Sequence, residues 1–193
     1  MLNNIQLSPH FSLLELTESA TARQRDIANI PPPEAVENLK RLCKGTLEPL
    51  RKALGLPVII TSGYRCKELN NIVNRSSKTS QHMLGQAADF YISSEGSRFS
   101  DLKVQSDLKV DDKVQCGKAA VQDSKVLGRR ELLIMGFRLI ILNEDIDYDQ
   151  LILYPTFIHV SYVSRSKNRR KIIKANGHGT YCTVTREAAL CLS

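Results

Sequence analysis

The sequence predicts a single α+β domain in which helices flank a small, mostly antiparallel sheet. Two long segments, 34–54 and 128–143, place apolar residues at helical spacing. Two segments rich in β-branched and aromatic residues, 148–154 and 157–162, are separated only by a short bend at Pro155, which is typical of a β-hairpin. A chain of 193 residues with 42% hydrophobic and 24% charged residues is long enough to bury one such core.

The first helices follow from capping and breaking residues. Residues 8–22 hold a short helix that Ser12 can cap, because Glu15 stands three positions later and completes a capping-box pattern. Three consecutive prolines then form a stiff extended joint. The helix predicted over 34–54 begins after them and ends at Gly55, since glycine is the usual residue just past a helix end.

The remaining elements alternate between apolar and polar segments. Residues 57–61 are β-branched and predict a strand, and the polar segment 67–73 predicts a short helix after it. Between 93 and 127 a short degenerate repeat occurs, with residues 100–104 echoed at 106–110. We interpret 93–127 as an inserted surface element, a loop or weak hairpin with partial disorder. It is either a tolerated insertion without a function of its own or an element that recognises wall polymer or a partner.

Charge and cysteine content limit the environment of the protein. A net charge of +7 favours polyanionic surroundings, such as a cell wall, nucleic acid or a membrane surface, although it also serves solubility. The dense basic run within 165–193 is interpreted as a solvated or wall-facing C-terminal tail, because no interleaved aromatic residues support nucleic-acid binding. Five cysteines without a CxxC pair predict free thiols of a reducing cytoplasm. Neither a signal peptide nor a span of ~18 apolar residues is visible.

The segment 80–89 contains the first candidate site. His82 and Asp89 stand seven positions apart, and Gly85 between them allows a tight reversal of the chain. The apolar run 90–92 follows Asp89 directly, so this carboxylate enters a buried strand and requires a positive partner. A metal ion is such a partner, and an imidazole with a carboxylate suits zinc better than calcium or magnesium.

The third candidate ligand is His159, a lone polar ring among the aromatic and β-branched residues of 156–162. Alone, such a histidine is more often a satisfied core residue than a ligand. With His82 and Asp89 it completes two histidines and one carboxylate, which is the ligand count of a catalytic zinc site with one position left open.

Three ordered segments carry a resemblance to a known family: Ser62-Gly63-Tyr64-Arg65, then Ser80-x-His82-x-x-Gly85-x-Ala87-x-Asp89, then Phe157-Ile158-His159-Val160-Ser161. They resemble the signatures of the zinc D-alanyl-D-alanine carboxypeptidase-like peptidases, whose fold is shared with the hedgehog signalling domain. The segment 149–152 is similar to the one that leads into the last histidine of bacterial and phage members. The resemblance covers about residues 8–92 and 128–175.

The resemblance implies a zinc peptidase acting on peptidoglycan stem peptides, as a D-Ala-D-Ala-type carboxypeptidase or a cross-bridge endopeptidase. It assigns His82, Asp89 and His159 to the zinc. It also implies that Arg65 faces the substrate, where its planar fork suits a C-terminal carboxylate or a developing oxyanion. Ser80 is expected to take part in substrate binding, and a surface Arg65 paired with a nearby carboxylate is the alternative.

The general base departs from the family pattern. Relatives supply Glu or Asp three or six residues before the last histidine, and this chain has Thr156 and Leu153 there. Asp149 is the nominated replacement, with Asp147 as the next nearest carboxylate and a purely structural Asp149 as the alternative. The missing base also leaves a second function open, namely a catalytically weakened zinc-bearing wall-binding or phage structural module.

The expected location follows from the same resemblance. A wall enzyme without a visible signal peptide is made in the cytoplasm and acts at the cell wall after release by lysis or by a dedicated route. A phage or prophage origin fits this expectation. A nucleic-acid-binding function rests on charge alone and is not expected.

Overall fold

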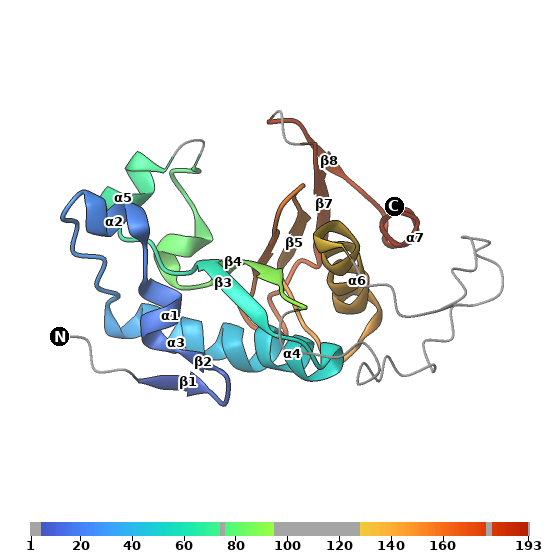
Figure 1. Cartoon of the computed structure of the whole chain (residues 1–193), viewed down its shortest axis with the longest axis horizontal. Coiled ribbons are helices and arrows are strands. Elements are labelled where there is room, and N and C mark those ends of the chain that lie inside the picture. Colours follow the sequence, from blue (N-terminus) through green and yellow to red (C-terminus); the bar gives the residue numbers. More distant parts are fainter. Residues whose placement is uncertain (1–4, 74–75, 95–127, 177–178, 193) are drawn as a thin grey trace.

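The computed structural model describes residues 5–73, 76–94, 128–176 and 179–192. The element predicted as an insertion at 93–127 lies almost entirely outside these ranges. Figure 1 shows the described elements as helices packed around a twisted sheet. No helix in the described ranges is both long and apolar enough to cross a membrane.

Within the described residues a six-stranded sheet forms the centre of the molecule, and four of its strands lie where strands were predicted. Its spatial order is β3 (Val58–Ser62), β4 (Ala87–Ile92), β6 (Ile158–Ser161), β5 (Gln150–Leu153), β7 (Lys171–Ala175) and β8 (Tyr181–Thr183). Neighbouring strands run antiparallel except β5 and β7, which are parallel. The predicted mostly antiparallel sheet is therefore confirmed, and β5 and β6 form the predicted hairpin.

Helices supply the rest of the fold, together with a short ladder between β1 (Gln6–Ser8) and β2 (Phe11–Ser12). In chain order they are α1 (Leu13–Thr17), α2 (Ala20–Gln24), α3 (Pro33–Leu42), the π-helical turn η1 (Cys43–Leu47), α4 (Glu48–Leu54), α5 (Lys67–Ile72), the 3₁₀ turn η2 (Gln81–Leu84), α6 (Arg129–Leu142) and α7 (Arg186–Leu190). The helix predicted over 34–54 is thus a continuous run of α3, η1 and α4. It ends at Gly55 in the left-handed conformation, as predicted.

The N-terminal helix divides into two. Ser12 caps α1 as predicted, because its hydroxyl accepts a hydrogen bond from the Glu15 backbone N–H. A second cap interrupts the expected single helix, since the Ser19 hydroxyl accepts from the Ala22 backbone N–H and starts α2.

The two faces of the sheet have different neighbours. Alternate residues such as Phe90, Leu153 and Ile158 are buried in the main core together with residues of α3, α4 and α6. Residues on the opposite face include Asp89 and His159, because successive side chains of a strand point to opposite sides. The helices therefore cover one face and leave the other for the candidate site.

The prediction of a solvated basic tail at 165–193 is corrected by the structure. Residues of β7 pair with β5 inside the sheet, and Ile172 and Ile173 are both buried. Two apolar residues between basic ones are too short a pattern to distinguish a strand from an exposed run. Burial against the sheet, which is a tertiary effect, determines the outcome.

Candidate metal centre

The position of His82 is set by a short turn and a glycine. His82 lies in η2, and Gly85 ends this turn with a φ of +67°. A Cβ atom at Gly85 would lie 2.3 Å from the Ala35 carbonyl oxygen, so the close approach of η2 to α3 requires glycine. The Asn38 side-chain amide donates to the Leu84 carbonyl and holds the end of the turn.

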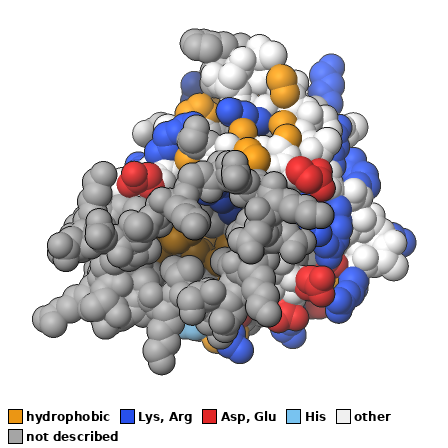
Figure 2. Space-filling view, turned by 90° about the vertical axis from the view of Figure 1, so that its right-hand side faces the viewer, with side chains coloured by type: hydrophobic (Ala, Val, Ile, Leu, Met, Phe, Trp, Pro, Cys, Tyr) orange, Lys and Arg blue, Asp and Glu red, His pale blue; other side chains and the backbone are white. Residues whose placement is uncertain are grey.

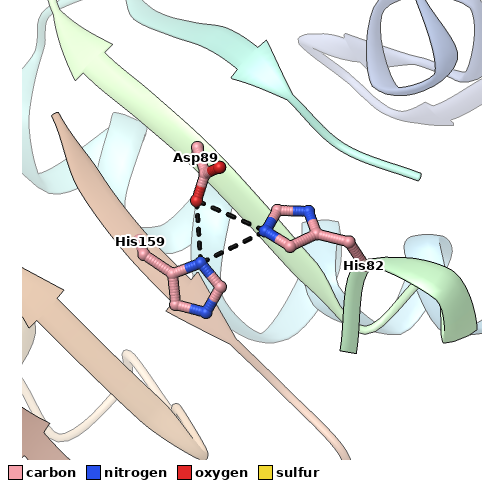
Figure 3. A group of neighbouring side chains, drawn as sticks. All are labelled: His82, Asp89 and His159. Carbon is pink, nitrogen blue, oxygen red and sulfur yellow. Dashed lines mark hydrogen bonds and ion pairs between the residues drawn. The ribbon is translucent and has the colours of Figure 1, made fainter. Parts of the chain in front are cut away.

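A single hydrogen bond fixes the orientation of the His82 ring. Its Nδ1 lies 2.7 Å from the Gly63 carbonyl oxygen, which can only accept, so Nδ1 carries the proton. The other ring nitrogen, Nε2, is left with its lone pair toward Asp89 and His159 (Figure 3). This is the arrangement by which proteins usually orient a metal-binding histidine.

Strand pairing brings the other two candidate ligands together. Asp89 in β4 and His159 in β6 are direct partners in the antiparallel ladder. Asp89 Oδ1 lies 2.7 Å from His159 Nδ1 and 3.4 Å from His82 Nε2, and the two histidine nitrogens are 3.3 Å apart. Figure 3 shows the three side chains pointing toward one another.

The geometry of this group fits a zinc ion. A tetrahedral site with bonds of about 2.0–2.1 Å places neighbouring ligand atoms about 3.3–3.4 Å apart. Both separations that involve His82 have this value, and the hydrogen-bonded pair of Asp89 and His159 needs to open by about 0.6 Å to reach it. Two imidazoles and one carboxylate are also a donor set that zinc accepts.

Electrostatics keep His82 and Asp89 in the protonation states of ligands. Burial lowers the pKa of His82 and favours the neutral imidazole, which is the form that binds metal. Burial alone would raise the pKa of Asp89, but the nearby His82 and His159 outweigh it and hold the pKa well below its usual range. Asp89 therefore remains a carboxylate.

Arg65 lies beside this group, after the end of β3. Its Nη2 is 4.0 Å from Asp89 Oδ2, and its side chain is only 11% exposed. The Arg65 backbone N–H donates to the His82 carbonyl, which ties the arginine segment to η2. Within the described ranges its Nε atom is buried without a hydrogen-bond partner.

A cavity of about 870 Å³ opens over the three candidate ligands. Arg65 and Ser80 line it, as do His82, Asp89 and His159, so the structure brings these predicted site residues to one cavity. Tyr154 and Tyr181, which the sequence did not single out, form part of its wall and have their hydroxyl groups 3.4 Å apart.

Asp149 also lines the cavity, yet its carboxylate is fully engaged. Arg169 contacts both oxygens, with Nε 2.9 Å from Oδ1 and Nη2 2.5 Å from Oδ2, and its backbone N–H donates to Oδ1 at 2.9 Å. The Gln81 side-chain amide donates to Oδ2 at 3.0 Å. Sequence reasoning missed this role of Arg169, because the residue sits in a run of basic side chains and lies 20 positions from Asp149.

The two positions where relatives carry the base do not provide one here. Leu153 is buried on the helix-covered side of the sheet, and Thr156 is exposed in the bend of the hairpin. Among the described residues that line the cavity, Asp89 and Asp149 are the only carboxylates. Asp147 lies elsewhere and pairs with Arg170.

These features together define an α+β protein with a His-Asp-His candidate metal group on the open face of its sheet. A family model described as Peptidase M15 matches residues 9–122, which is more than half of the chain. The chain therefore belongs to the Peptidase M15 family, and the resemblance drawn from the three signatures is confirmed. The match includes Arg65, His82 and Asp89 and ends before His159. No curated protein and no solved structure matches the chain.

Proposed function

We propose that this protein is a zinc peptidase that hydrolyses peptide bonds in peptidoglycan, as a D-Ala-D-Ala-type carboxypeptidase or a cross-bridge endopeptidase. The observation that carries the proposal is the convergence of His82, Asp89 and His159 in one cavity beside Arg65, in a chain of the Peptidase M15 family. The candidate ligand atoms of these three residues all lie within 4.8 Å of one another.

His82 Nε2, Asp89 Oδ1 and His159 Nδ1 are the atoms proposed to hold the ion. Zinc bound by them would supply Lewis acidity toward a scissile carbonyl and toward water. Arg65 contributes a cation whose fork can grip a peptide carboxylate or an oxyanion. Ser80 lines the same cavity and is proposed to contact the substrate. The pairing of Arg65 with Asp89 is loose enough, at 4.0 Å, to leave the guanidinium available.

Hydrolysis further requires a group that takes a proton from water and returns it to the leaving amine. The role of general base for Asp149 stays a prediction. Its hydrogen bonds weigh against that role, because a base needs a free lone pair and a pKa near the working pH. Burial would raise the pKa of Asp149, but Arg169 and Gln81 outweigh it and hold the pKa below its usual value.

The absence of a free carboxylate at the position of the base, within the described part of the chain, favours a second candidate function. With Leu153 at the usual position of the base and Asp149 engaged by Arg169, the cavity suits a protein that holds zinc and a wall fragment but hydrolyses slowly. Such a protein would be a cell-wall-binding or phage structural module.

The positive charge of the protein also bears on its substrate. The chain has a net charge of +7, and Figure 2 shows Lys and Arg side chains along one edge of the face in view. Cell walls carry anionic polymers, so this charge favours binding to the wall. We propose peptidoglycan stem peptides as partners, no nucleic acid, and action at the wall after release from the cytoplasm.

Digestion of purified peptidoglycan by the zinc-loaded protein tests the proposal. Mass spectrometry of the products identifies the bond: release of free D-alanine indicates the carboxypeptidase, and new termini within cross-bridges indicate the endopeptidase. If zinc binds and wall fragments are retained but no new termini form, the binding module is the correct assignment. Protein that binds neither zinc nor wall fragments contradicts both functions.

A further inference from the structure

Asp149 has an unusual set of contacts for a residue at the edge of a cavity. It is 1% exposed, and it receives hydrogen bonds from the side chains of Gln81 and Arg169 and from the Arg169 backbone. The contact with Arg169 uses both ends of the guanidinium fork, which is the strongest geometry for a carboxylate and an arginine. Both oxygens of Asp149 are therefore committed to donors from the protein itself.

Two partners of Asp149, Gln81 and Ser161, belong to the segments that carry two of the candidate metal ligands. Gln81 directly precedes His82 in η2. Ser161 follows His159 by two residues in β6, its carbonyl accepts from the Asp149 backbone N–H at 2.6 Å, and its hydroxyl lies 3.5 Å from Asp149 Oδ2. Asp149 thus lies between the histidine-bearing turn and the histidine-bearing strand.

Arg169 contacts both Asp149 and Gln81. Its Nη2 lies 3.5 Å from the Gln81 side-chain oxygen, while its Nε and backbone N–H bind Asp149. Gln81 is therefore contacted by both members of the ion pair. The Asp149 carbonyl also accepts from the Lys171 backbone N–H, which extends the connection to the start of β7.

We propose that Asp149, Arg169 and Gln81 form a brace that sets the distance between His82 and His159, so that Asp149 and Arg169 are positioning residues of the metal centre. The inference rests on the proposed zinc function. It assigns Asp149 to holding the ligands and not to moving protons. Without the brace, η2 keeps its bonds to Gly63, Arg65 and Asn38. The backbone link from the Tyr162 N–H to the Gln86 carbonyl also remains, but the side-chain link from Gln81 through Asp149 to the strand of His159 is lost.

If the brace positions the ligands, its removal should weaken zinc binding by a measurable factor. Removing groups that orient metal ligands typically weakens metal binding by about 10–100-fold. Arg169→Ala and Gln81→Ala are therefore expected to raise the zinc dissociation constant by roughly that factor. Gln81→Ala is the milder change, since it removes one amide and leaves the ion pair between Asp149 and Arg169 intact.

The neighbouring residue provides a matched control. Arg170 is of the same type, lies in the same segment, and pairs with Asp147 as Arg169 pairs with Asp149. The two arginine side chains are 49% and 58% exposed, respectively. Neither Arg170 nor Asp147 lines the cavity. Arg170→Ala is therefore expected to leave zinc affinity unchanged while removing an ion pair between the same two residue types.

Zinc affinity is measured by competition with a chromogenic chelator, and hydrogen exchange of the zinc-free proteins gives a second readout. Loss of the brace is expected to speed exchange of the Gly85 and Gln86 amides, which bond back to carbonyls within η2. The inference is overturned if Arg169→Ala matches Arg170→Ala in both measurements. If the wild-type protein binds no zinc, the proposed function is wrong. The hydrogen-exchange comparison of Arg169→Ala with Arg170→Ala then tests by itself whether the brace holds η2 in place.

Asp149→Asn separates positioning from base catalysis. If Asp149 positions the ligands, the variant binds zinc more weakly, and saturating zinc restores most of the activity. If Asp149 is the base, zinc affinity stays at the wild-type value and turnover falls by about 10²–10⁴-fold even at saturation. The second result refutes the brace as the role of Asp149.

Discussion

At the scale of single residues, the candidate centre depends on partners that fix each ligand. The Gly63 carbonyl fixes the tautomer of His82, and the contact between Asp89 and His159 keeps these two proposed ligand atoms 2.7 Å apart. These partners hold the three side chains close together before any ion binds. Such preorganisation reduces the ordering cost of metal binding.

Arg65→Lys tests the substrate role of the arginine. A lysine preserves the charge but cannot reproduce the bidentate fork, so turnover on peptidoglycan fragments is expected to fall by at least about tenfold while zinc content stays normal. Steady-state kinetics and elemental analysis measure the two quantities. Arg41→Lys, at an exposed position in α3, is the control and should retain wild-type turnover. Equal activity in the two variants would place Arg65 outside the substrate site.

The sequence made some site residues predictable and hid others. Asp89 enters an apolar strand, so its charge required an explanation, and His82 and His159 supplied it. The role of Arg169 could not be predicted, because it is one of several basic residues in a row and the sequence does not indicate which of them pairs with Asp149. The bidentate contact with Asp149 exists only because the segment after β6 folds back beside β5, which is a tertiary feature.

At the scale of elements, the hairpin and the strand alternation explain why the centre forms where it does. Pairing of Asp89 with His159 follows from the register of β4 and β6. A shift of β6 by one residue against β4 would move His159 to the helix-covered face and away from Asp89. The long helices and the hairpin were predictable from periodicity, whereas β7 was not, since its strand contains only two consecutive isoleucines among basic residues.

Gly85→Ala tests the contact between η2 and α3. Alanine at this positive φ costs about 1–2 kcal/mol, and the added Cβ also meets the Ala35 carbonyl at 2.3 Å, so a larger loss of stability is expected. Gly55→Ala is the matched control, because Gly55 has a similar φ of +64° and no atom within 4 Å of the added Cβ. Chemical denaturation measures both. Equal destabilisation of the two variants would show that η2 does not pack closely on α3.

At the scale of the whole molecule, zinc binding couples to stability. A ligand that binds only the folded state raises the free energy of unfolding, by about 2.7 kcal/mol at 100 times its dissociation constant. Zinc is expected to raise the melting temperature of the wild type accordingly, as differential scanning calorimetry can show. His82→Ala should abolish this shift.

His10→Ala provides the control for that experiment. His10 lies away from the centre, where its ring contacts Glu48. Its removal should lower stability slightly and preserve the response to zinc. A zinc response that survives in His82→Ala would assign the binding to other residues.

Acid stability gives a test of Asp149 that needs no metal. Because the folded-state pKa of Asp149 is depressed, its contribution to stability is present above the unfolded-state pKa of about 3.9 and is lost as the pH falls through the folded-state value. The difference in unfolding free energy between the wild type and Asp149→Asn is therefore expected to be constant near neutral pH and to shrink below about pH 4. Denaturant unfolding in the presence of a chelator measures it, and Asp89 cancels from the difference because both proteins retain it. A difference that stays constant or grows on acidification would show that Arg169 and Gln81 do not stabilise the Asp149 carboxylate in solution.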